Sequence, residues 1–424
     1  MVIRTQRLRF KHASPLHVSP GGDGAVKPIR RPYASSRVAS IDAARGAAML
    51  FVCLAHFTNA YFFLNGKGEI GVNLVVIGMI ASPTFVTVSG LVAGFLAVTR
   101  SSSFAKLRRK LIDRGLFLLI IGHVVLALSG IVTGKGLARA YRIEYITDAI
   151  GFAILIGPWL IAKLPVWSRI GLAAALFALD WSAVLFWAPS AGIPAIFKQY
   201  MIGAVAGSQW EMTAGGFVLI PWLSVYLVGT TIGERVGLYY ATHKQALAHV
   251  FLAKIGLVCI AGTLSVKVAL VASRRWAPTL TQAHPSVIHV LSFYQKFPPG
   301  PVYLFFFGGA GMLLVGGVLE AARRGIQPLL VNQLRQIGLA SFFVYIVQFY
   351  VYGVLLAGLR LPYSPLWPLI FLISIVLLAL VANVWNSIEG NRFLTVGIGP
   401  LVERLTNRRR TMLETPAALE SPTA

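Results

Sequence analysis

Residues 37–63 read RVASIDAARGAAMLFVCLAHFTNAYFF, and this stretch decides how the rest of the chain is interpreted. It is long enough to span a bilayer as a helix, yet it contains Asp42, Arg45, His56 and Asn59. Helical geometry places these four side chains on one face, with Arg45 and His56 about 16 Å apart along the axis. Because ionisable groups are costly to place in hydrocarbon, a polar face inside a membrane helix indicates a functional site.

The composition is that of a membrane protein. Of the 424 residues, 56% are hydrophobic and only 12% are charged, and the mean hydropathy is +0.72. A soluble protein carries roughly twice that share of charged residues. The net charge of +24 would suit nucleic acid in a soluble protein, but here almost all the basic residues lie in tails and connections. We therefore expect membrane lipid as the partner of these charges, and no nucleic acid.

Ten apolar segments are long enough to cross a bilayer, which predicts an all-α, polytopic membrane helix bundle of about ten helices. The segments are roughly 41–63, 70–98, 107–133, 143–162, 169–188, 216–236, 249–272, 301–320, 336–357 and 366–387. With ten crossings, 26 lysine and arginine residues fall on the side that holds both termini, and 9 fall on the opposite side. The positive-inside rule then predicts that both termini are cytoplasmic.

The same pattern divides the chain into three parts. We expect residues 1–36 to form a disordered basic cytoplasmic tail, 37–390 the transmembrane domain, and 391–424 a cytoplasmic C-terminal tail. The first part lacks the apolar run of a cleavable signal peptide. Cys53 and Cys259 both lie in predicted membrane helices, so a disulfide framework is not expected. These features predict a multi-pass integral protein of the bacterial inner (plasma) membrane.

Further ionisable residues lie in the third and fourth predicted spans. The basic run at 106–115 suits lipid phosphates or, through Arg109 and Arg114, a phosphorylated cofactor. His123 follows in the same span, as a packed, hydrogen-bonded histidine or as a catalyst. Asp148 either caps the fourth helix, pairs with a nearby arginine, or orients a histidine imidazole. A uniform helix would place Arg109 and His123 on one side and Arg114 on the other.

The second predicted span contains SPTFVTVSGLVAG at residues 82–94. Its small and hydroxyl-bearing side chains suit either close helix packing or the lining of a passage beside the first span. Pro83 is expected to kink this helix and to free a backbone carbonyl for another partner. The sequence has no metal-ligand spacing, nucleotide-binding loop, HExxH or GxSxG motif, so we expect no metal.

The opening stretch resembles the signature of multi-helix membrane acyltransferases. The acyltransferase-three, OpgC-like and heparan-α-glucosaminide N-acetyltransferase-like groups share R-x-x-x-(L/I)-D-x-x-R-G-x-A, with a histidine about ten residues beyond the second arginine. The matching residues are Arg37, Ile41, Asp42, Arg45, Gly46, Ala48 and His56. Weaker similarities occur at 85–94, 111–123, 221–234 and 337–350. In the last of these, Gln348 stands where the family pattern leads us to expect histidine, which puts any role of that position in doubt.

The resemblance implies an integral membrane acyltransferase. It implies a cytoplasmic acyl-CoA donor, expected to be acetyl-CoA, and an acceptor hydroxyl or amine on an extracytoplasmic glycan or glycolipid of the cell envelope. His56 would act as general base or as a transient acyl carrier. The catalytic candidates are His56, Asp148 and His123. The candidates for binding the donor are Arg45, Asp42, Arg109 and Arg114.

Two other function classes fit the same residues. Ten helices, intramembrane charge and kinking prolines also suit a transporter or flippase for a lipid-linked or small anionic substrate. A non-enzymatic partner in an envelope assembly is the third possibility. Consumption of labelled acetyl-CoA by membranes distinguishes the enzyme from the transporter.

Overall fold

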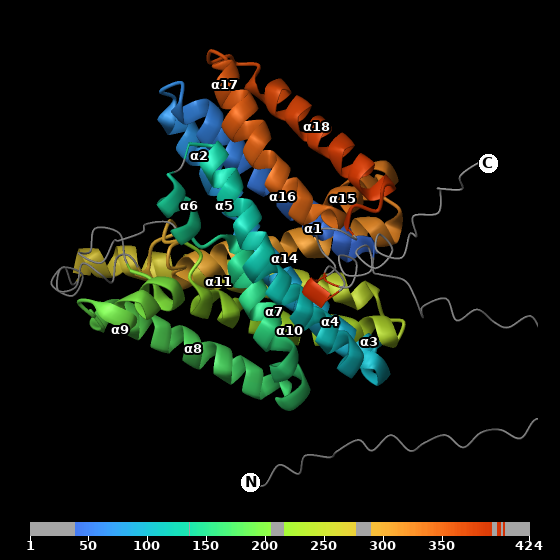
Figure 1. Cartoon of the computed structure of the whole chain (residues 1–424). Coiled ribbons are helices and arrows are strands. Elements are labelled where there is room, and N and C mark those ends of the chain that lie inside the picture. Colours follow the sequence, from blue (N-terminus) through green and yellow to red (C-terminus); the bar gives the residue numbers. More distant parts are fainter. Residues whose placement is uncertain are drawn as a thin grey trace, which may run out of the picture. The chain divides into compact units, whose positions relative to one another are not determined.

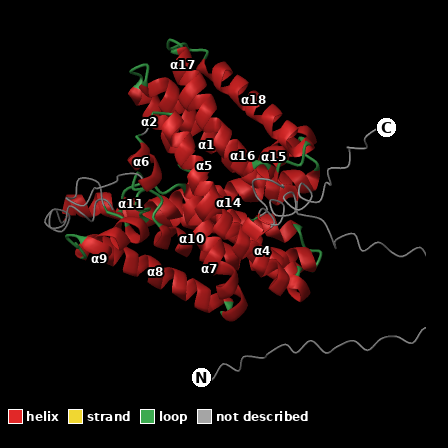
Figure 2. Cartoon of the chain, in the orientation of Figure 1, coloured by secondary structure: helices red, strands yellow, loops and turns green. Residues whose placement is uncertain are grey.

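The computed structural model describes residues 39–134, 136–204, 216–276, 290–391, 397–399 and 402. Over these ranges the chain is built from helices and short connections, with no strand (Figure 2). Arg37 of the signature, the predicted tail at 1–36 and nearly all of the tail at 391–424 lie outside the described residues.

The helices follow one another along the chain as shown by the colours of Figure 1. The α-helices are α1 (Ala39–Thr58), α2 (Gly68–Gly78), α3 (Ala81–Thr99), α4 (Phe104–Phe117), α5 (His123–Val132), α6 (Leu137–Arg142), α7 (Ile146–Lys163), α8 (Val166–Phe186), α9 (Gly192–Phe197), α10 (Leu219–Ala241), α11 (Ala246–Trp276), α14 (Pro301–Arg324), α15 (Pro328–Leu339), α16 (Ser341–Tyr350), α17 (Ala357–Leu359) and α18 (Trp367–Ser387). The π-helical segments are η1 (Asn59–Phe63), η3 (Leu118–Gly122), η4 (Lys198–Ile202) and η5 (Val351–Leu356), and η2 (Ser101–Ser103) is a 3₁₀ turn.

Nine helical segments within the described ranges are long and apolar enough to cross a membrane. Each coincides with one of the predicted spans. The remaining predicted span, 216–236, forms α10, which has 23 residues but is less apolar because it contains Glu234 and Arg235. The structure therefore confirms an all-α, polytopic membrane bundle and an integral multi-pass protein.

The second predicted span is two helices, α2 and α3, and Pro83 explains the break. Proline has no N–H, so the carbonyl of Met79, four residues earlier, has no helical donor. The Tyr303 hydroxyl of α14 donates to this carbonyl at 3.3 Å. The expected interruption and the expected freed carbonyl are both present, and the carbonyl ties α3 to α14.

The ninth predicted span, 336–357, is not one helix. Ala340 separates α15 from α16, so the membrane-crossing segment starts at Ser341 rather than at residue 336. The hydrophobic pattern continues across the break, and this is why the sequence predicted a single helix there. The physical reason for the break is that α15 packs along α1 instead of continuing α16 (Figure 1).

Close backbone contact holds α1 against α15. A Cβ atom on Gly46 would lie 1.8 Å from the Leu334 carbonyl oxygen, and a Cβ on Gly338 would lie 1.8 Å from the Asp42 carbonyl oxygen. Only glycine permits this approach on both sides. Gly46 belongs to the acyltransferase-like signature, so its place in the motif follows from packing.

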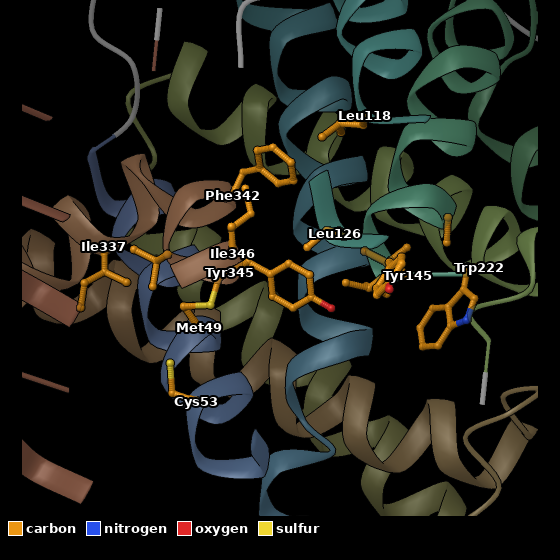
Figure 3. Packing of buried hydrophobic residues seen from close by; sticks show 14 of the residues in the cluster. Met49, Cys53, Leu118, Leu126, Tyr145, Trp222, Ile337, Phe342, Tyr345 and Ile346 are labelled. Carbon is orange, nitrogen blue, oxygen red and sulfur yellow. The ribbon is translucent and has the colours of Figure 1, made fainter. Parts of the chain in front are cut away.

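The hydroxyl- and glycine-rich stretch of α3 serves both expected purposes. Gly94 packs against the Thr230 carbonyl of α10, where a Cβ would approach to 1.9 Å, and Gly233 of α10 packs against Leu91 in return. Ser82 and Ser89, on the same helix, line a cavity described below. The main buried cluster joins α1, α5, α7 and α16, with the labelled side chains of Figure 3 at their contacts.

Candidate functional site

A cavity of about 500 Å³ lies among α1, α3, α7, α10 and α16. Arg45 and His56 from α1 line it, together with Asn59 from η1, so the predicted polar face of residues 37–63 points into this cavity. Arg114 of α4 and Glu144, before α7, line it as well. The volume falls within the range of small-molecule sites, roughly 300–1,000 Å³.

Contacts within the chain orient Arg45 at one end of the cavity. Its Nη2 donates to the Ser341 Oγ at 2.7 Å, and its Nη1 lies 3.6 Å from the Asp42 Oδ1, one turn earlier on α1. Asp42 is buried and does not line the cavity, so it acts on the site through Arg45. The sequence predicted this pairing from the spacing of the two residues, and the pair is present.

Arg114 lies at the same end as Arg45. The link between them is Phe342, the neighbour of Ser341, whose ring centroid is 6.5 Å from that of Phe117, one turn after Arg114. Two guanidinium groups from different helices thus contribute to one end of the cavity wall. Arg109, the other predicted phosphate ligand on α4, is exposed and does not line the cavity.

His56 lies further along the cavity. Its ring meets the edge of Phe349 at a centroid distance of 5.0 Å and that of Tyr345 at 6.4 Å. Because Ser341 contacts Arg45 and Phe349 contacts His56, α1 and α16 run parallel from the Arg45 end to the His56 end. Figure 3 shows the phenol of Tyr345 extending from α16 toward Tyr145.

His123 and Asp148 form a pair beside the cavity. The His123 Nδ1 is 2.9 Å from the Asp148 Oδ2, and its Nε2 is 3.1 Å from the Tyr141 carbonyl oxygen. The Asp148 Oδ2 also accepts the Tyr145 N–H at 2.7 Å, which caps the start of α7. Asp148 therefore both caps a helix and orients a histidine. Neither member of the pair is in the described cavity wall, whereas Tyr145 is.

A π-helical segment changes the relation between the two ends of the third predicted span. That span was expected to be uniform, with Arg109 and His123 on one side, but η3 interrupts it immediately before His123. A π-turn holds more residues than an α-turn and shifts the angular position of everything that follows. The angular prediction for a uniform helix therefore does not apply here.

The sequence analysis missed several residues of the cavity wall. Glu144 is 5% exposed, and its Oε1 has no hydrogen-bond partner among the described residues. An acidic residue beside an apolar run was a visible signal, but it lies at the predicted edge of the span. Lys296, on the connection before α14, had been considered only as a topological charge. Burial lowers the pKa of Lys296 to about 8.

Gln348 occupies the position where histidine was expected. It is fully buried, its amide donates to the Tyr345 carbonyl at 3.2 Å, and it is not in the described cavity wall. An amide cannot take up a proton as a histidine does. The proton-accepting side chain in the described wall is consequently His56 on α1, with Glu144 as a second candidate.

Comparison with known proteins agrees with the fold and the cavity. No curated protein matches the chain. The sequence model of the heparan-α-glucosaminide N-acetyltransferase catalytic family matches residues 37–273, which are more than half of the chain and include His56, Arg114 and Glu144. The protein therefore belongs to the heparan-α-glucosaminide N-acetyltransferase catalytic family and is a membrane acyltransferase, an enzyme that transfers groups other than aminoacyl groups.

Proposed function

We propose that the protein moves an acetyl group from cytoplasmic acetyl-CoA to a hydroxyl or amine of an extracytoplasmic glycan or glycolipid at the bacterial inner membrane. One observation carries the proposal. A continuous cavity has Arg45 and Arg114 in its wall at one end and His56 further along. In this proposal residues 37–390 form the catalytic domain, and both termini are cytoplasmic.

The wall suits the two chemical parts of a coenzyme A thioester. Guanidinium groups bind phosphate oxygens in a bidentate manner, so Arg45 and Arg114 would hold the donor phosphates. Arg109 is exposed on the same helix, where it would meet phosphates outside the cavity. Between the arginines and His56 the wall includes Met49, Val52 and other apolar side chains, which suit an extended pantetheine arm.

The proposed reaction uses His56 as the general base. An imidazole nitrogen accepts the proton of the acceptor hydroxyl or amine while that oxygen or nitrogen attacks the thioester carbonyl. The C–S bond then breaks, and coenzyme A leaves with a proton as the free thiol. In the alternative path His56 itself attacks and carries the acetyl group before the acceptor takes it. The His123–Asp148 pair supports either path by holding Tyr145 at the wall.

The central test is His56→Ala in membrane vesicles supplied with labelled acetyl-CoA and an envelope glycan fraction. Loss of a general base lowers the rate by roughly 100-fold to 10,000-fold. Val52→Ala is the matched control because Val52 shares the wall but has no group that can take a proton. Label trapped on the protein before acceptor is added would favour the acyl carrier path.

Two results would overturn the proposal. Full activity of His56→Ala, with normal membrane insertion, would remove His56 from the chemistry. If wild-type vesicles consumed no acetyl-CoA but moved a lipid-linked substrate across the bilayer, the transporter or flippase reading would replace acyl transfer.

A further inference from the structure

The end of the cavity beyond Tyr145 carries polar atoms that the donor does not need. The buried Glu144 Oε1 and the Thr147 Oγ1, both at the start of α7, have no hydrogen-bond partner among the described residues. Both residues line the cavity. Buried polar groups are nearly always hydrogen-bonded, so atoms of this kind beside a cavity indicate a missing polar ligand.

Two aromatic rings and a lysine continue from Glu144. The Phe217 N–H donates to the Glu144 carbonyl oxygen at 3.0 Å. The Phe217 and Phe297 ring centroids are 5.1 Å apart and nearly perpendicular. The Lys296 Nζ lies 5.3 Å from the first centroid and 5.2 Å from the second. Glu144, Lys296 and both rings line the same cavity, so they form one contiguous part of its wall.

The connection that carries Lys296 is held in place by hydrogen bonds. The Gln295 amide donates to the carbonyl oxygens of Phe297 at 2.8 Å and Pro298 at 3.2 Å. The Trp181 indole N–H of α8 donates to the Pro299 carbonyl at 3.1 Å. Lys296 is therefore presented to the cavity from a segment fixed on both sides.

The charge of Lys296 has no ion-pair partner in the described part of the chain; its neighbours there are the two rings. A second cation, Arg142, lies near this region. Burial and the Glu144 carboxylate raise the pKa of Tyr200, whereas Arg142 lowers it, so both charges act on the same phenol. The region is thus equipped to attract an anion beside the Glu144 carboxylate.

We propose that Glu144, Thr147, Lys296, Phe217 and Phe297 form the acceptor subsite, and that this subsite takes a pyranose ring with an anionic substituent. The inference rests on the proposed function and extends it to the class of acceptor. Lys296 pairs with the carboxylate or phosphate of the sugar, and Glu144 accepts hydrogen bonds from its hydroxyl or ammonium groups. The phenyl rings cover the apolar face of the pyranose.

The test measures sugar binding to the detergent-purified protein by titration calorimetry, without acyl-CoA. The probes are methyl glucuronide, glucose 6-phosphate and methyl glucoside, which differ in the charged group. We expect at least one anionic sugar to bind about tenfold or more tightly than methyl glucoside. The stronger of the two identifies carboxylate or phosphate as the natural substituent.

The variants then assign the preference to residues. Lys296→Ala should abolish the advantage of the anionic sugar, and Lys296→Arg should retain most of it. Glu144→Gln, which keeps the side-chain shape, should weaken all three sugars several-fold. Val75→Ala is the control, because Val75 lines the cavity but belongs to α2 and has no polar group.

Equal binding of all three sugars to the wild-type protein, or a preference that survives Lys296→Ala, would overturn the subsite. Failure of the proposed function looks different. In that case the anionic preference and its loss in Lys296→Ala persist, while labelled acetyl-CoA is not consumed with any acceptor.

Discussion

Arg45 combines exposure to the cavity with two contacts inside the chain, to Ser341 and to Asp42. Arg45→Ala should raise the KM for acetyl-CoA about 10-fold to 100-fold, because a hydrogen bond to a charged group contributes roughly 1.5–3 kcal/mol. The measurement is initial-rate kinetics with varied acetyl-CoA and saturating acceptor. Ser341→Ala is the matched control, since it removes the internal hydrogen bond and leaves the guanidinium. An unchanged KM in Arg45→Ala would exclude the donor role.

Lys296 gives the protein a pH dependence of defined sign. Burial lowers its pKa to about 8, so its ammonium is present at pH 7 and is lost as the pH rises above 8. We expect kcat/KM for an anionic acceptor to fall by up to about tenfold per pH unit above that value. Lys296→Arg keeps its charge, and its profile should stay flat there. A similar fall with a neutral acceptor, or in Lys296→Arg, would assign the titration to another group.

Some site residues could be predicted from the sequence, and others could not. Arg45 and His56 lie on one helix, so their shared face follows from spacing within a single segment. Glu144 and Lys296 come from connections about 150 positions apart. Only the packing of α7, α10 and the segment before α14 brings them to one wall. The contact of His123 with Asp148 was foreseeable as chemistry, but its place beside the cavity depends on η3.

At the scale of helices, the contact of α1 with α15 determines where Arg45 is held. Gly46→Ala would place a methyl group 1.8 Å from the Leu334 carbonyl, so the helices must separate. We expect a loss of roughly 1–3 kcal/mol or more, as overpacking typically costs. Thermal unfolding followed by size-exclusion chromatography in detergent measures it. Gly317→Ala is the control, since a Cβ there meets no atom within 4 Å. Equal melting temperatures would refute the contact.

The spans themselves were predictable because length and hydropathy suffice to identify a membrane helix. The interruptions inside them were harder. Pro83 announces its own break, but nothing in the run 336–357 marks Ala340, where both sides are equally apolar. That break arises because α15 gains a partner in α1. The π-helical segments likewise depend on which side chains each turn meets, and no local motif indicates them.

For the whole molecule, the charge distribution predicts the orientation in the membrane. Lys67→Cys should react with an impermeant maleimide in intact cells, because the connection before α2 is predicted to face outward. Ser102→Cys should react only after permeabilisation. Both are measured with Cys53 and Cys259 replaced by serine. Residues 67 and 102 are each exposed, so accessibility differs only through the membrane. The reverse pattern would invert the proposed path from donor to acceptor.

The π-helical segment η3 has a consequence for how this chain tolerates changes in length. A π-turn accommodates about one residue more than an α-turn, so η3 is equivalent to a single-residue insertion in a continuous helix. Deleting one residue between 118 and 122 would let α4 and α5 join as one regular helix, with little loss of helical structure. Everything after it would rotate by about 100°, carrying His123 away from Asp148. A family member shortened by one residue here would keep the bundle and lose the pair that holds Tyr145 at the cavity wall.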